Sequence, residues 1–188
     1  MRVLITGTNG FIGSNLKKHF DNPLEMNEDV LVTKEWLDEN KPDAVFHVGA
    51  CSNTLETDVN YIMKVNFEST KTITDWCKLN NKPLIYSSSA ASYGTNGEYP
   101  SNLYGWSKYV AEQYVISNGG IALRYFNVYG PGEEHKGEMA SFLYQANLRH
   151  EVGEKVRLFP GGPTRDFVYI KDITSANLYA LENFSELS

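Results

Sequence analysis

The chain has 188 residues and a formal net charge of −6 at pH 7, with 41% hydrophobic and 21% charged residues. This length allows one sizeable core but is short for two full domains. The acidic balance argues against a nucleic-acid-binding protein, and no apolar run approaches the roughly 18 residues of a membrane-spanning helix, so we expect neither nucleic acid nor membrane as a partner.

The N-terminal segment and the two cysteines indicate the compartment. Residues 1–5 run directly into a strand-like stretch, which leaves no room for a signal peptide. Cys51 and Cys77 show neither metal-ligand nor redox spacing, so we interpret them as reduced, buried thiols. The sequence therefore predicts a cytoplasmic protein without a metal site.

Strand-like and helix-like segments alternate along the first two thirds of the chain. The predicted strands are residues 3–6, 44–48, 83–87 and 121–125, and the predicted helices are residues 11–20, 59–79 and 103–117. Parallel strands need a helical crossover between them, so this alternation predicts an α/β fold, a Rossmann-like parallel sheet with helices on both faces.

The composition of the sequence changes after Gly130, where glycines and prolines separate short elements. We expect a dinucleotide-binding Rossmann domain at residues 1–130. Residues 131–188 would form a small, partial substrate-binding region that packs on it.

Three glycines follow the first predicted strand and open the first predicted helix. Gly7, Gly10 and Gly13 stand at three-residue spacing, which lets the chain turn sharply and lets a pyrophosphate approach the backbone. In this strand–turn–helix context the motif predicts a dinucleotide site, whereas the glycine spacing alone would also fit a tight turn without a ligand.

The residue that would bind the adenosine ribose is less clear. An acidic residue about 20 positions after the first glycine usually contacts the ribose hydroxyls. Glu25, Glu28 and Asp29 are available, but residues 21–29 show no convincing second strand, as if one strand–helix unit were missing. An ordinary surface role fits these acids equally well, so the cofactor is predicted as NADP or NAD.

A phenol and an amine define a candidate proton-transfer centre. Tyr104 and Lys108 are four residues apart and so lie on one face of the helix predicted at 103–117. A neighbouring ammonium and a nicotinamide cation would lower the pKa of Tyr104, allowing it to accept a proton from a sugar hydroxyl. Lys108 would also bind the nicotinamide ribose. The strand predicted at 83–87 is followed by hydroxyls that can bind the reacting oxygen; we choose Ser89, with Ser88 second.

These motifs resemble those of the extended short-chain dehydrogenase/reductase family over nearly the whole chain. Four segments carry the resemblance: residues 47–52, 124–131, 135–141 and 165–169. The second and fourth are common to many enzymes of nucleotide sugars. The first and third are similar to those of the ADP-L-glycero-D-manno-heptose 6-epimerases. The resemblance therefore implies an NAD(P)-dependent nucleotide-sugar epimerase, with ADP-heptose as the favoured substrate.

The resemblance also implies a mechanism and further site residues. Hydride leaves C6″ of the heptose and returns to the other face of the ketone, with Tyr104 and Lys136 as the two bases. From the residues alone, Lys136 would be a solvated charge in a polar loop. The implied cofactor contacts are Phe11, Ile12, Gly49, Ala50, Cys51, Ser52, Asn66 and Val128, and the implied substrate contacts are Ser88, Ser89, Asn127, Phe159, Gly161 and Arg165.

Some of these roles have structural alternatives. Asn66 could equally accommodate a helix irregularity, and Arg165 could form a salt bridge with Asp166. The resemblance further implies a homo-oligomer formed through the two helices that hold Asn66 and Tyr104. Members of the family usually continue well beyond residue 188, so the substrate-facing region is interpreted as truncated or unusually compact.

Two rival functions are weighed against the epimerase. A sugar-nucleotide 4,6-dehydratase would place an Asp-Glu pair directly after its serine, where this chain has Ala90 and Ala91, so this function is excluded. A 4-epimerase or 4-keto reductase of another nucleotide sugar stays open. A non-catalytic dinucleotide-binding protein is the alternative from a different class, and the presence of both Tyr104 and Lys108 argues against it.

Overall fold

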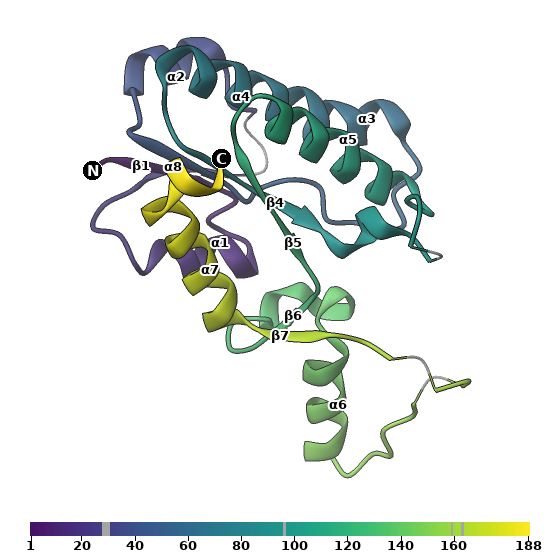
Figure 1. Cartoon of the computed structure of the whole chain (residues 1–188). Coiled ribbons are helices and arrows are strands. Elements are labelled where there is room, and N and C mark those ends of the chain that lie inside the picture. The colour runs from purple at the N-terminus through teal and green to yellow at the C-terminus, as the bar shows by residue number, and fades with distance from the viewer. Residues whose placement is uncertain (28–30, 96, 159, 163) are drawn as a thin grey trace.

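The computed structural model describes the whole chain except residues 28–30, 96, 159 and 163. Five parallel strands form its main sheet in the order β2–β1–β3–β4–β5 (Figure 1). They are β1 (Val3–Thr6), β2 (Leu24–Met26), β3 (Ala44–His47), β4 (Leu84–Ser89) and β5 (Ile121–Tyr125). The predicted Rossmann-like sheet is confirmed.

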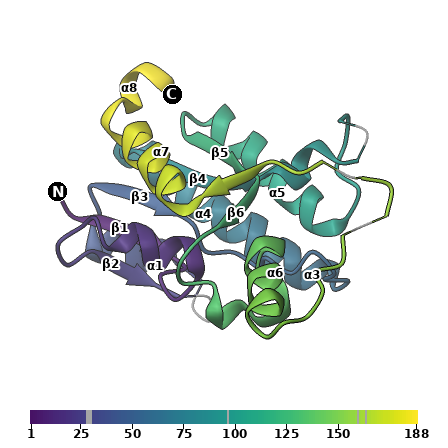
Figure 2. The ribbon, with the colours of Figure 1, turned by 90° about the horizontal axis from the view of Figure 1, so that it is seen from below.

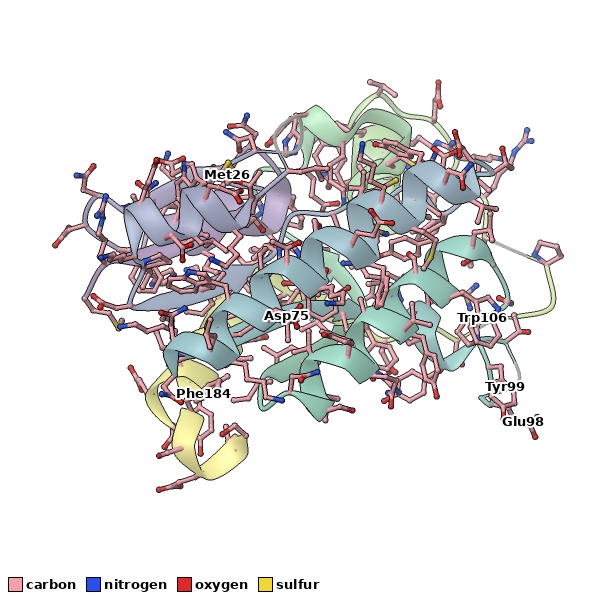
Figure 3. All side chains as sticks on the ribbon, turned by 90° about the horizontal axis from the view of Figure 1, so that it is seen from above. Met26, Asp75, Glu98, Tyr99, Trp106 and Phe184 are labelled. Atoms are coloured by element: carbon pink, nitrogen blue, oxygen red, sulfur yellow. The ribbon has the colours of Figure 1, made fainter. Side chains whose placement is uncertain are left out.

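Helices cover both faces of this sheet. One face carries α2 (Lys34–Asn40), α4 (Ser69–Asn80) and α5 (Leu103–Ser117), and the other carries α1 (Phe11–Lys17) and α7 (Ile170–Glu182). Figure 3 looks onto α4 and α5, which lie side by side, with Trp106 near one end of the layer and Phe184 near the other. The helix predicted at 59–79 is divided into α3 (Val59–Met63), a π-helical turn (Lys64–Glu68) and α4.

The core forms because alternate strand residues point to opposite faces. Leu4 packs beneath α2 and α4 in a cluster with Leu37 and Trp76. Val3 and Ile5 join a cluster on the other side with Leu16 of α1 and Ala180 of α7. Because both faces are covered, the first residues of β1, β3 and β4 are apolar on both sides of the sheet, and polar residues come at the carboxyl ends of these strands.

The second strand is a correction to the sequence analysis. Residues 24–26 form β2, which pairs in parallel with β1, and α2 supplies the following helix. The strand was missed because it is only three residues long and contains the charged Glu25. This glutamate pairs with Lys17 at 2.8 Å, so it has a surface role. Glu28 and Asp29, the other candidate acids, lie outside the described residues.

A smaller unit lies beyond the carboxyl ends of the main strands. β6 (Asn127–Tyr129) and β7 (Phe167–Tyr169) form a two-stranded parallel sheet. Between them come a 3₁₀ segment (Glu134–Met139) and α6 (Phe142–Glu151). In Figure 1 α6 projects below the main sheet, and in Figure 2, seen from below, it therefore lies toward the viewer.

The chain then returns to the main sheet through α7. Asn177 of α7 donates a hydrogen bond of 2.6 Å to the hydroxyl of Tyr125 at the end of β5, and α8 (Phe184–Leu187) follows. The division of the chain at residue 130 therefore stays a prediction, with part of the second region packed on the first. Among the described residues, no helix combines the length and apolar character needed to cross a membrane.

Candidate active site

A cavity of about 400 Å³ opens at the carboxyl ends of β1, β3, β4 and β5, where open α/β sheets bind their ligands. It brings together most of the residues predicted from the sequence. Those that line it are Gly7, Gly10, Phe11, Ile12, Gly13, Gly49, Ala50, Ser52, Ser88, Ser89, Tyr104, Asn127, Val128 and Lys136.

The glycines allow three backbone segments to approach closely at one end of this cavity. Gly7 has φ +69°, and a Cβ at this position would lie 2.5 Å from the Cα of Gly49. A Cβ on Gly13 would lie 2.1 Å from the carbonyl oxygen of Gly7. No side chain caps the start of α1 after Gly10, so its first amides face the cavity. Such a cradle has the shape that a pyrophosphate requires.

The residue at the expected ribose position is Asn27, which directly follows β2. Its Oδ1 accepts hydrogen bonds from the Thr8 hydroxyl at 2.9 Å and the Asn9 amide at 3.0 Å. Asn27 also lines a small cavity of about 40 Å³ that shares Gly7, Gly49 and Ala50 with the larger one. The sequence analysis missed Asn27 because it looked for a carboxylate, although its distance from Gly7 was a usable signal.

A chain of buried hydrogen bonds behind the cradle connects β1, β3 and α4. The Gly49 amide donates to the Thr6 hydroxyl at 2.8 Å, and this hydroxyl contacts His47 Nδ1 at 2.8 Å. His47 Nε2 contacts the Thr70 hydroxyl at 2.9 Å, and Thr70 donates to the Asn66 carbonyl. Thr70 has given its one proton to the carbonyl, so it must accept from Nε2–H. Nδ1 is therefore the acceptor of the Thr6 proton.

This arrangement requires a neutral histidine. Burial, together with the positive charge of Lys108, lowers the pKa of His47 to about 3. A proton on Nδ1 would oppose the Thr6 hydroxyl, which already accepts the Gly49 amide. His47 is thus a fixed element of the framework that holds the 49–52 segment.

Asn66 fixes the next part of the same segment. Its Oδ1 accepts the Cys51 amide at 2.8 Å, and its Nδ2 donates to the Cys51 carbonyl and to the Ser107 hydroxyl. Asn66 lies within the π-helical turn, so the predicted helix irregularity is present. It does not line the cavity, and a direct cofactor contact stays a prediction.

The position of Tyr104 follows from the local geometry at the start of α5. Asn102 caps the helix by accepting the Gly105 amide at 2.8 Å. Gly105 lets α5 approach the 3₁₀ turn after β4, because a Cβ there would lie 2.6 Å from the Ala91 carbonyl oxygen. As a result, Tyr104 and Ser89 line the same cavity.

Electrostatics at Tyr104 differ from the expectation. Burial raises the pKa of Tyr104, while its interaction with the Ser89 side chain opposes this rise. The expected lowering of the Tyr104 pKa by Lys108 was wrong for this structure, because the Lys108 ammonium donates instead to the Ser87 carbonyl at 2.8 Å. Desolvation lowers the pKa of Lys108 to about 8. Its contact with a nicotinamide ribose stays a prediction.

Ser88 and Ser89, the two candidate hydroxyls, are in different situations. Ser88 donates its proton to the buried Glu112 carboxylate at 2.6 Å, so toward the cavity it can act only as an acceptor. Ser89 accepts the Ala91 amide at 3.2 Å and retains its own proton for donation. Only Ser89 can therefore donate to a reacting oxygen, which supports its choice over Ser88.

Lys136 also lines the cavity, and it comes from the 3₁₀ segment between β6 and α6. Its Nζ lies 5.2 Å from the ring centroid of Phe11 and 4.0 Å from Oε2 of Glu133. Burial lowers the pKa of Lys136, and the Glu133 carboxylate opposes this shift. A second ionisable side chain is thus available in the cavity beside Tyr104.

Several predicted residues are not brought to this cavity. Gly161 and Arg165 are exposed outside it, and the Arg165 guanidinium donates to the Thr164 carbonyl. Among the described residues, no ion pair joins Arg165 to Asp166 either. Phe159 lies outside the described residues, and Lys108 is buried behind the site.

The cysteines were only partly predicted. Both thiols are free, and Cys77 is buried, which raises its pKa to about 12. The expectation that Cys51 is buried was wrong. It is half-buried and lines the smaller cavity, because it belongs to the segment that follows β3 into the site.

The sequence analysis also missed an apolar wall. Phe126, Met139 and Phe142 line the cavity beside Lys136. They come from segments around β6 and α6 that lack a strong periodic pattern. The arrangement as a whole joins a dinucleotide cradle to a phenol, a hydroxyl and an amine, which suits the oxidation and reduction of a carbinol.

Comparison with known proteins identifies the family. The profile of the NAD-dependent epimerase/dehydratase family matches residues 3–188. The chain belongs to this family.

Relatives extend the comparison. The chain is 36% identical to an ADP-L-glycero-D-manno-heptose-6-epimerase of Brachyspira hyodysenteriae, over 96% of this chain and 72% of the relative. The alignment runs over 231 positions, more than the 188 residues of the chain, so this relative of the epimerase/dehydratase family carries insertions that the chain lacks.

Solved structures of other enzymes have a similar fold. The ADP-L-glycero-D-manno-heptose-6-epimerase of Helicobacter pylori is 30% identical, with a TM-score of 0.84 over 96% of this chain and 73% of that one. The WbmG enzyme of Bordetella bronchiseptica, solved with NAD and UDP, is 21% identical, with a TM-score of 0.81 over 96% and 69% of the two chains, and supports the fold.

The epimerase/dehydratase cradle gives a first prediction. Gly13→Ala should weaken NAD and NADP binding by about tenfold or more, because the added methyl meets the backbone of Gly7. Gly153→Ala is the control, since Gly153 does not line the cavity and an added Cβ there would meet nothing within 4 Å. Calorimetric titration of both variants measures the difference. Equal affinities would contradict the close packing of the cradle.

His47 gives a prediction for stability. Its pKa is about 3 in the folded protein against 6.5 for an ordinary histidine, so between these values the unfolded chain binds one more proton. The free energy of unfolding should therefore fall by about 1.4 kcal/mol per pH unit from this group as the pH drops from about 6.5 toward 3. Urea unfolding should show a shallower dependence in His47→Gln. The exposed His19→Gln is the control, and an unchanged slope in His47→Gln would refute the prediction.

Proposed function

We propose that the protein epimerises an ADP-linked heptose at C6″, using NADP or NAD as a cofactor that is restored in each turnover. The observation that carries the proposal is the cavity in which Tyr104, Ser89 and Lys136 lie together beside the glycine cradle. The similarity to two ADP-heptose 6-epimerases supports the choice of substrate.

The dinucleotide would be held by the residues of the cradle. Gly7, Gly10 and Gly13 leave room for the pyrophosphate, and the 49–52 segment passes along the cofactor. When bound, the dinucleotide supplies a nicotinamide ring that takes a hydride from the sugar and returns it. Asn27 carries no carboxylate, so its side chain gives no argument for a preference for NAD over NADP.

The protein's own part is proton transfer at the sugar oxygen. Ser89 donates a hydrogen bond to this oxygen, and Tyr104 accepts its proton when the carbinol is oxidised to a ketone. Because burial raises the pKa of Tyr104, its phenolate would depend on the positive charge of the bound nicotinamide. The ketone then presents its other face. During reduction the Lys136 ammonium donates a proton to the oxygen. Tyr104 then releases its acquired proton to water, and the neutral Lys136 amine takes up a proton from water, so both groups are restored. Two proton-transferring groups suit an inversion better than one.

The remaining assignments concern binding. Ser88, which can only accept, would face a substrate hydroxyl, and Asn127 and Val128 would lie between the substrate and the nicotinamide. Arg165, Phe159 and Gly161 would meet the diphosphate and nucleotide of the substrate. We also propose a homo-oligomer formed through the surface of α4 and α5.

Substrate identity is tested by incubating the protein with ADP-, UDP-, GDP- and dTDP-sugars and reading the stereochemistry by NMR. We expect inversion at C6″ of ADP-heptose. Inversion at C4 of another nucleotide sugar would instead identify a 4-epimerase on the same framework. Cofactor binding without turnover of any sugar would favour a non-catalytic dinucleotide-binding protein.

Tyr104→Phe should lower kcat by about 10²- to 10⁴-fold while NAD(P) affinity is retained, because the phenylalanine keeps the ring and removes only the proton acceptor. Turnover and cofactor titration are measured on the same preparation. Tyr99→Phe is the matched control, since Tyr99 is exposed outside the cavity. Normal turnover in Tyr104→Phe would refute the proposed role of Tyr104 as the proton acceptor.

Lys136→Met should suppress epimerisation of ADP-heptose but spare dismutation of a substrate analogue that needs only one base. Methionine fills a similar volume next to Phe11 and removes only the ionisable group. Lys155→Met, at an exposed position, is the control. Equal loss of both activities, or no loss of either, would count against two proton-transferring groups.

A further inference from the structure

Glu133 is a buried carboxylate that the sequence analysis did not single out. It lies between β6 and α6, and only 1% of its side chain is exposed. A buried carboxylate persists only where donors compensate its lost hydration. Its role should therefore be visible in the groups that donate to it.

The donors to Glu133 come from both ends of one loop. Oε1 accepts the Gly130 amide at 3.0 Å and the Ser141 hydroxyl at 2.9 Å, and Oε2 accepts the Ser141 amide at 2.6 Å. Gly130 follows β6, and Ser141 caps α6 by accepting the Tyr144 amide. The carboxylate thus closes residues 130–141 into a loop with fixed ends.

Lys136 lies on this closed loop. Its amide donates to the Glu133 carbonyl at 2.9 Å, and its Nζ lies 4.0 Å from Glu133 Oε2. The Phe11 ring lies on its other side, at 5.2 Å from Nζ. Its neighbours Glu134 and His135 are exposed, and Tyr104 and Tyr125 are the other titratable side chains among the described residues that line the cavity. Glu133 is therefore the buried negative charge closest to this amine among the described contacts.

We propose that Glu133 is a positioning residue that holds the Lys136 amine in the cavity and keeps it protonated until it donates to the substrate. That Lys136 donates a proton to the substrate rests on the proposed function. That Glu133 holds the Lys136 amine in place and favours its protonated form does not depend on it.

The electrostatic argument follows from two opposing effects. Burial against Phe11 and the apolar wall lowers the pKa of Lys136, whereas the nearby Glu133 raises it. Without the carboxylate, burial would lower the pKa of Lys136 further, and the neutral amine that this shift favours cannot deliver a proton. The same carboxylate is tied to backbone amides, so it cannot move with the lysine, and the position of the charge is set by the fold.

The test compares Glu133→Gln with Glu134→Gln, which removes the same charge one residue away from an exposed position. Lys136 is titrated by NMR in lysine-labelled protein, and its signal is identified by its loss in Lys136→Met. Removal of an opposite charge at this range lowers a pKa by about 1 to 3 units. In Glu133→Gln the midpoint should fall by at least about one pH unit, whereas Glu134→Gln should leave it in place.

The pH profile of turnover gives a second readout. If Lys136 acts as the proton donor, the basic limb of kcat should move toward acid in Glu133→Gln by the same amount. Glu133→Asp keeps the charge and should restore the midpoint of the titration even if shortened hydrogen bonds lower kcat. A purely structural role would change kcat without moving either the midpoint or the limb.

Folding is monitored separately, because glutamine offers one acceptor where Glu133 uses two. Amide exchange at Gly130 and Ser141 reports whether the loop stays closed, and Glu133→Asp replaces Glu133→Gln if the latter does not fold. An unchanged Lys136 midpoint in folded Glu133→Gln, or a Glu133→Asp midpoint displaced toward acid despite the retained charge, would overturn the proposal. A displaced midpoint with full epimerisation by Lys136→Met would refute the proposed function alone.

Discussion

The buried chain of hydrogen bonds through His47 is the constraint on which the rest of the site depends. It joins the end of β1 to the end of β3 through Thr6, and β3 to α4 through Thr70. Asn66 then continues the connection to the Cys51 backbone and to Ser107 of α5. Each hydroxyl in the chain has one proton, so the direction of every bond is determined by its neighbours. The cradle and the helix that carries Tyr104 are therefore positioned by the same set of donors and acceptors.

Buried carboxylates perform a related task around the cavity. Glu112 accepts both the Ser88 proton and the Arg124 guanidinium, whose Nη2 lies 2.6 Å from Oε1. Glu133 accepts backbone and hydroxyl protons from the loop of Lys136. Neither carboxylate needs to touch a substrate. Each instead sets the hydrogen-bonding or charge state of a neighbouring side chain. Glu112 leaves Ser88 only as an acceptor, and in our proposal Glu133 keeps Lys136 protonated.

Much of the fold could be predicted because its signals are periodic. The α5 helix was predicted at its observed bounds, 103–117, from its place in the alternation of strands and helices, and the structure shows that Asn102 caps its start. The β2 strand was missed because three residues at a sheet edge are too few to show alternation. An irregularity at Asn66 was one of the two alternatives weighed from the sequence, but its π-helical form was not predicted, since Asn66 there binds the Cys51 backbone, a contact between distant parts of the chain.

The site shows the same division between local and non-local information. The cradle glycines and the spacing of Tyr104 and Lys108 are local patterns, so the sequence predicted them. The direction of the Lys108 ammonium was not predictable, because it depends on the Ser87 carbonyl of a neighbouring strand. Glu133 was overlooked for a similar reason: in a run of charged residues nothing distinguishes it from the exposed Glu134. Only the folded loop shows which of the two is buried.

The different fates of Ser88 and Ser89 show how strand geometry sets the chemistry. Successive residues of a strand point to opposite sides, so one of two adjacent serines at the end of β4 must face α5 and the other must turn away from it. Ser88 faces α5 and donates its hydroxyl hydrogen bond to the Glu112 carboxylate. Ser89 begins the 3₁₀ turn and accepts the Ala91 amide, which leaves its proton directed elsewhere. If the cavity oxidises a carbinol, the donor to its oxygen is therefore selected by the pleat of β4, and an exchange of roles between these serines would require a shift in strand register.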